Sequence, residues 1–86
     1  MDLTKLVQDD GLPELPTITM GKYRHYKDKL YEVIGVAMHS ETLKALVVYR
    51  PLYKKQVQLW VRPYDMFMES VEVNGKTVPR FEKIDD

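Results

Sequence analysis

The sequence contains no cysteine. This absence excludes a disulfide framework, a thiolate metal site and a thiol nucleophile. The chain also has no apolar run that approaches the ~20 residues of a membrane-spanning helix. Its first residues carry the acidic Asp2 and lack the apolar core that a secretory signal peptide needs. We therefore expect a cytoplasmic protein with no membrane partner.

Glycine is scarce, and the four glycines stand apart at positions 11, 21, 35 and 75. A glycine-rich loop of the kind that binds a phosphate is therefore missing. The two histidines, His25 and His39, do not fall in a metal-ligand spacing motif. The 86 residues suffice for one small domain and no more. We predict no metal site and no cofactor.

Net charge is absent too, because thirteen Lys and Arg residues balance thirteen Asp and Glu residues. The charges are nevertheless unevenly distributed. Residues 1–20 carry one basic and four acidic residues, residues 21–55 eight basic and three acidic, and residues 56–86 four basic and six acidic. The middle of the chain is thus basic, and a basic segment attracts anions even when the total charge is zero.

Short β-strands dominate what the sequence does contain. Six segments rich in apolar, β-branched and aromatic residues alternate with turn residues, at 22–27, 30–39, 43–50, 57–62, 70–73 and 77–81. Residues 30–39 are apolar on both alternating faces, which indicates a central strand. Asn74-Gly75 predicts a type I′ hairpin turn, and Pro79 confines the strand that follows it to a sheet edge.

These features predict a mainly β domain over residues 21–84. We expect a small SH3-like barrel of five or six short antiparallel strands with one short helical turn at 64–68, and an OB-like barrel is the alternative. Residues 1–20 are predicted to form an extended N-terminal arm, because Pro13 and Pro16 block a helix. Before the prolines, Leu3, Leu6 and Val7 fit one face of a single helical turn.

Seven short motifs carry a resemblance to a known family. In chain order they are Gly21-Lys-Tyr-Arg-His-Tyr26, Tyr31-Glu-Val33, His39-Ser-Glu-Thr42, Val47-Val-Tyr-Arg50, Leu59-Trp-Val-Arg-Pro63, Met66-Phe67 and Val78-Pro-Arg-Phe81. Together they resemble the bacterial domain-of-unknown-function family 1653 over about residues 21–84. The resemblance implies a compact, mainly β domain and assigns no catalytic residue. Residues 1–20 lie outside it, and Met38 stands where the family commonly has a basic residue.

Trp60 and Arg62 are the first candidates for ligand binding. If Val57, Leu59 and Val61 face the core, Trp60 and Arg62 share the exposed face of the same strand. An aromatic ring beside a guanidinium is a frequent anchor at binding sites. In the alternative reading, neighbouring chain covers Trp60, and Arg62 caps the carbonyls of the 64–68 turn.

Tyr49 and Arg50 close another long strand and are candidates for the same surface. An arginine there suits bidentate binding of a carboxylate or phosphate. The alternative for Arg50 is an internal ion pair with Glu32 or Glu69.

His25 and Tyr26 lie in a run that interleaves aromatic and basic residues, which suits phosphate contacts combined with base stacking. The alternative is an ordinary first strand whose basic side chains lie along its surface.

His39 and Glu41 are the main candidates for general acid–base catalysis, and His25 is a further candidate. A small hydrolase is therefore one alternative function, although Ser40 does not sit in a nucleophile elbow. In the simpler reading, His39 ends a strand, and Ser40 and Thr42 satisfy the backbone of the loop that follows.

We predict a small non-enzymatic binding module for an anionic ligand, such as nucleic acid or a nucleotide. Its candidate ligand-binding residues are Trp60, Arg62, Arg50, Tyr49, His25, Tyr26 and His39. A structural or protein-interaction domain is a further alternative. In that case Leu12, Leu15 and Ile18 of the arm dock on a protein partner or on a second copy in a homodimer.

Overall fold

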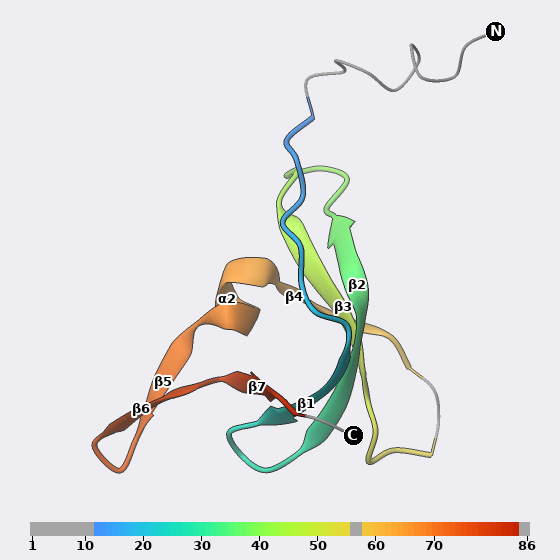
Figure 1. Ribbon diagram of the computed structural model, residues 1–86. Helices are drawn as coiled ribbons and strands as arrows, with labels where there is room; N and C mark the ends of the chain where they lie inside the picture. Colours follow the sequence, from blue (N-terminus) through green and yellow to red (C-terminus); the bar gives the residue numbers. More distant parts are fainter. Residues whose placement is uncertain (1–11, 56–57, 85–86) are drawn as a thin grey trace, which may run out of the picture.

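The computed structural model describes residues 12–55 and 58–84. Five strands form an antiparallel sheet in the order β4-β3-β2-β1-β7. They are β1 (Gly21–His25), β2 (Leu30–Met38), β3 (Ala45–Pro51), β4 (Trp60–Pro63) and β7 (Phe81–Lys83). A second sheet pairs β5 (Ser70–Val73) with β6 (Lys76–Pro79), and α2 (Tyr64–Met68) connects the two sheets (Figure 1).

The mainly β fold with one short helical turn at 64–68 is confirmed within this part of the chain. β2 lies between β1 and β3, as its two apolar faces predict. An irregularity between Val33 and Gly35 inserts Ile34 into β2, a β-bulge that strengthens the local twist. The sheet is barrel-like in its curvature but remains open, because β4 and β7 are its two edges.

The core lies on the inner face of this sheet and is largely aromatic. Its seven buried residues are Tyr23, Tyr31, Val33, Val47, Tyr49, Phe67 and Phe81. Phe67 of α2 stacks on Phe81 with ring centroids 4.0 Å apart and meets Tyr23 and Tyr49 edge to face. The short helix α2 therefore covers the inner face of the sheet, because its Phe67 ring packs among the aromatic rings of the core.

The orientation on which the first reading of Trp60 and Arg62 depends, with Leu59 and Val61 facing the core, is wrong. Leu59 and Val61, expected in the core, are 61% and 57% exposed, whereas Trp60 packs against the core cluster. The β3–β4 register pairs Tyr49 with Trp60, and directly opposed residues share a face of the sheet. Tyr49 points inward, so Trp60 does too. Val57 lies outside the described residues.

The hairpin of β5 and β6 projects from the main sheet (Figure 1). Asn74 and Gly75 at its tip have φ of 51° and 78°, which confirms the predicted type I′ turn. The strand predicted at 77–81 is interrupted at Arg80: β6 pairs with β5 alone, and β7 joins the main sheet beside β1. β6 is thus an edge strand, as Pro79 indicates.

Residues 12–20 run beside the sheet without helix or strand (Figure 1). The Tyr23 hydroxyl donates to the Thr19 carbonyl at 2.7 Å, and the Tyr64 hydroxyl donates to the Thr17 carbonyl at 3.3 Å. Ile18, a candidate for docking on a partner, packs against the chain's own core. The helical turn predicted around Leu3, Leu6 and Val7 lies outside the described residues.

Candidate ligand-binding surface

Aromatic rings and lysines gather at one end of the main sheet. The β1–β2 turn and the β3–β4 connection meet there, because the Leu52 backbone N–H donates to the Leu30 carbonyl at 2.9 Å (Figure 1). We call this region the aromatic–basic end; its members are Tyr26, Lys27, Lys29, Tyr53, Lys54 and Trp60. A lysine ammonium group lies over each of its three rings. The distances from Nζ to the ring centre are 5.8 Å for Lys27 over Tyr26, 4.8 Å for Lys29 over Tyr53 and 5.3 Å for Lys54 over Trp60.

The charge of this end is strongly positive. Residues 26–29 and 52–55 contain four lysines and a single acidic residue, Asp28. The Asp28 carboxylate lies 3.7 Å from the Arg24 guanidinium, so its charge is partly balanced by a further cation. Tyr26 and Tyr53 are 37% and 44% exposed. This end of the sheet therefore combines aromatic ring faces with positive charge. Each ammonium group is attracted electrostatically to the ring over which it lies.

A buried layer supports these exposed rings. The hydroxyls of Tyr31 and Tyr53 lie 3.2 Å apart, and the Tyr31 ring contacts both Tyr53 and Trp60. Burial raises the pKa of Tyr31 well above its usual value, and the hydrogen bond with Tyr53 raises it further. Tyr31 is therefore a neutral hydrogen-bonding partner that orients Tyr53.

Arg62 lies beneath the same region on the inner face. Its Nε–H donates to the Tyr49 hydroxyl at 3.1 Å, and its guanidinium carbon lies 5.3 Å from the centre of the Phe81 ring. Tyr49 is only 2% exposed, so it is a core residue that positions Arg62. The fixed guanidinium adds positive charge behind the exposed rings.

His25 connects the aromatic–basic end to the core. Its ring lies 4.5 Å from the Tyr26 ring and 4.8 Å from the Phe81 ring, measured between centroids. Its Nδ1 accepts a hydrogen bond from the Lys27 backbone N–H at 3.1 Å, so the neutral ring carries its proton on Nε2. Burial lowers the pKa of His25, and the charges of Arg62, Arg80 and Lys27 lower it further.

This lowered pKa predicts a pH-dependent stability. Because the folded-state pKa of His25 lies below the ordinary 6.5, the unfolded chain binds the proton more tightly. The contribution of His25 is complete above about pH 6.5 and is lost as the pH falls through the folded-state pKa. We expect the urea concentration at the unfolding midpoint to decrease when the pH is lowered from about 7.5 to about 5.5, and to decrease less in His25→Phe. An undiminished decrease in His25→Phe would count against this assignment.

The remaining predicted site residues, Arg50 and His39, have hydrogen-bond partners within the chain. Arg50 Nε lies 2.6 Å from Glu32 Oε1 across the β2–β3 ladder, which is the predicted internal ion pair. His39 follows the far end of β2, and its Nδ1 accepts hydrogen bonds from the backbone N–H groups of Glu41 and Thr42. The ring thus orders its own loop.

The two histidines flank β2, a strand of nine residues that is roughly 30 Å long. They therefore cannot act on one substrate atom. At His39, Nδ1 meets backbone donors and no carboxylate, so a hydrolase built on His39 and Glu41 gains no support. Within residues 12–55 and 58–84, no three His, Asp or Glu side chains lie close enough together to hold a metal ion.

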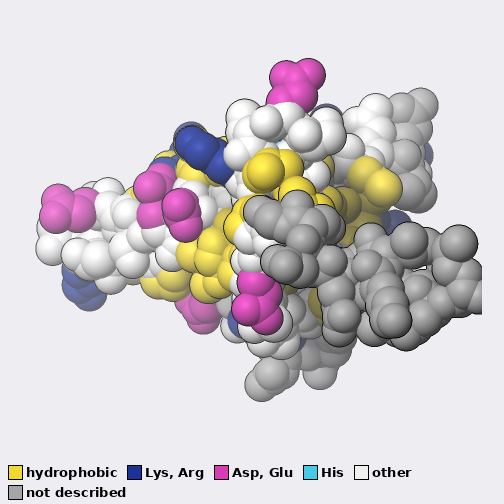
Figure 2. Space-filling view, turned by 90° about the horizontal axis from the view of Figure 1, so that it is seen from above, with side chains coloured by type: hydrophobic (Ala, Val, Ile, Leu, Met, Phe, Trp, Pro, Cys, Tyr) yellow, Lys and Arg dark blue, Asp and Glu magenta, His cyan; other side chains and the backbone are white. Residues whose placement is uncertain are grey.

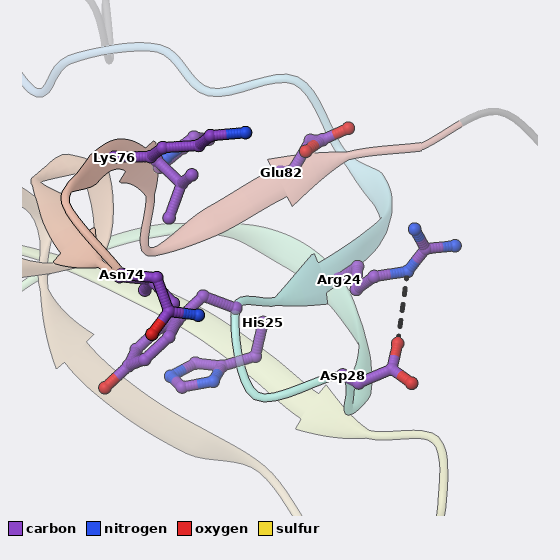
Figure 3. Close-up of a pocket in the computed structure, with 10 residues that line it drawn as sticks. Arg24, His25, Asp28, Asn74, Lys76 and Glu82 are labelled. Carbon is purple, nitrogen blue, oxygen red and sulfur yellow. Dashed lines mark ion pairs between the residues drawn. The ribbon is translucent and has the colours of Figure 1, made fainter.

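A groove that the sequence did not reveal lies beside Tyr26. It has a volume of about 510 Å³ and separates the β1–β2 turn from the β5–β6 hairpin (Figure 3). The two hairpins meet where the Tyr26 backbone N–H donates to the Arg80 carbonyl at 3.0 Å and diverge beyond it. We call it the fork groove. Its lining residues are Arg24, His25, Tyr26, Asp28, Val73, Asn74, Lys76, Val78, Pro79 and Glu82.

Comparisons with known proteins agree with the motifs. A family model described as "Protein of unknown function (DUF1653)" matches residues 21–83. The crystal structure of a DUF1653 protein from Bordetella bronchiseptica is similar, with a TM-score of 0.72 and 32% sequence identity over 78% of this chain and 87% of that one. No curated protein matches. In the described part of the chain, none of the helices has the length and apolar character needed to cross a membrane. The resemblance read from the sequence is confirmed, and the chain belongs to the DUF1653 family.

Proposed function

We propose that this protein is a small binding module for single-stranded nucleic acid and that the aromatic–basic end is its ligand surface. The observation that carries the proposal is the placement of an ammonium group over each of three rings, 4.8 to 5.8 Å from the ring centres. Two of these rings, Tyr26 and Tyr53, are exposed, and the third, Trp60, is partly buried. Such an arrangement provides a face on which a base stacks and a cation that reaches the adjoining phosphate.

The charge distribution supports the same ligand class. Four lysines against one acidic residue make this end attractive to a polyanion although the whole chain is neutral. An aromatic ring can stack on any base, so we expect weak dependence on sequence at these three rings. Trp60 and Arg62 remain in the proposed surface although both lie on the inner face, opposite to the first reading. Trp60 contributes a partly buried ring, and Arg62 contributes a positive charge held by Tyr49.

A titration of fluorescently labelled single-stranded RNA and DNA octamers tests the proposal. Each phosphate contact with single-stranded nucleic acid contributes a slope of about −0.7 to log K against log salt. Three or four lysine contacts predict an affinity that falls roughly 20- to 50-fold between about 50 and 200 mM salt. An absence of binding at the lower salt concentration would contradict the proposal.

A further inference from the structure

The fork groove differs in charge from the aromatic–basic end that it adjoins. Its two cations, Arg24 and Lys76, are balanced by Asp28 and Glu82. Figure 2 shows acidic and basic side chains side by side over the end of the molecule where the β5–β6 hairpin projects. A groove with balanced charges has no net attraction for a phosphate. Its occupant is therefore expected to be the uncharged part of a ligand.

The lining of the groove suits a flat aromatic ring. Tyr26 contributes an exposed ring, and Val78 and Pro79 contribute apolar walls from β6. A volume of about 510 Å³ lies within the usual range for small-molecule sites, roughly 300 to 1,000 Å³. Tyr26 also belongs to the aromatic–basic end, so the groove continues directly from the surface proposed to hold the phosphates.

Two neutral groups in the groove can form hydrogen bonds with the edge of a base. Asn74 is exposed at the hairpin tip, and its amide offers one donor and one acceptor, the pair that reads adenine N7 and N6–H. His25 carries its proton on Nε2, because Nδ1 accepts from the Lys27 backbone. Figure 3 shows that the two side chains come from opposite sides, Asn74 from the β5–β6 turn and His25 from β1.

We infer that the fork groove is a base-binding subsite that prefers adenine, filled by one base of a strand whose phosphates lie on the aromatic–basic end. This inference rests on the proposed function and adds base preference to it. A bidentate amide contact discriminates against a wrong base by roughly 5- to 150-fold. The stacking rings alone produce no comparable preference.

The test compares labelled A8 and U8 RNA with the wild type, Asn74→Gly and Thr77→Ala. Glycine is compatible with the φ of 51° at position 74, so Asn74→Gly removes the amide and keeps the turn. Thr77 lies on the same hairpin outside the groove lining and serves as the matched control. We expect wild type and Thr77→Ala to bind A8 at least 5-fold more tightly than U8, and Asn74→Gly to bind both with the affinity of wild type for U8.

Other outcomes separate the two proposals. If A8 and U8 bind equally to the wild type, or if Asn74→Gly keeps the preference, the subsite inference is overturned and the proposed function stands. If neither RNA binds at about 50 mM salt, the proposed function fails and the subsite inference fails with it.

Discussion

Replacing Phe67 with alanine is expected to remove about 3 to 5 kcal/mol from the free energy of unfolding. The Phe67 side chain is 1% exposed, stacks on Phe81 and meets Tyr23 and Tyr49 edge to face. Its removal leaves a cavity in the middle of the core and separates α2 from the sheet. A chain of 86 residues has a total stability of roughly 4 to 13 kcal/mol, so this one ring carries much of it.

Urea denaturation followed by Trp60 fluorescence measures this loss, because Trp60 is the only tryptophan. Met66→Ala is the matched control, since Met66 lies on the same short helix and is exposed. We expect its effect to remain within about 0.5 kcal/mol. A Phe67→Ala variant as stable as Met66→Ala would show that the helix does not close the core.

The double variant Lys29→Glu/Lys54→Glu is expected to bind single-stranded RNA roughly 100-fold more weakly than wild type at about 50 mM salt. The two lysines lie over Tyr53 and Trp60, and under the proposed function they contact the phosphates of stacked bases. Losing two contacts should also reduce the salt slope by about 1.4. The same labelled-octamer titration gives both values.

Lys44→Glu/Lys83→Glu is the control for this experiment. It changes the net charge by the same amount, and neither residue belongs to the aromatic–basic end. A wild-type salt slope and a small loss of affinity are expected for it. Equal weakening by the two double variants would mean that RNA responds to total charge and that the three ring–lysine pairs form no specific site.

The sequence predicted the β architecture well where local signals and the fold agree. β2 is central because both of its faces are apolar, and Asn74-Gly75 forms its turn because both residues accept positive φ. β4 shows where such a pattern is insufficient. Leu59, Trp60 and Val61 are all apolar, so this segment does not show which of its two faces is buried. Only the pairing of Trp60 with Tyr49 determines that the Trp60 ring faces the core.

The proposed binding surface was predictable only in part, for a related reason. Composition identified Trp60, Arg62, His25 and Tyr26 as candidates, and these four residues lie around one end of the sheet. Arg50 and His39 resembled them in residue type, but local partners satisfy both side chains. The contacts support the alternative reading of each residue, which is an internal ion pair for Arg50 and a role within its own loop for His39.

The fork groove could not be predicted, because it depends on two hairpins that are distant in sequence. Tyr26 and Arg80 are joined by a backbone hydrogen bond that no local pattern reveals. The same holds for Tyr53, which a long connection brings against Tyr31. Non-local pairing of this kind is a property of the folded sheet, and no local pattern in the sequence reveals it.

The fluorescence of Trp60 during titration with unlabelled single-stranded RNA at about 50 mM salt tests the central claim most directly. The only tryptophan of the chain lies in the proposed surface, so a base that stacks there must alter its emission. We predict saturable quenching that follows the binding curve and is reversed by added salt. Unchanged Trp60 emission at RNA concentrations that saturate binding would contradict the proposed surface.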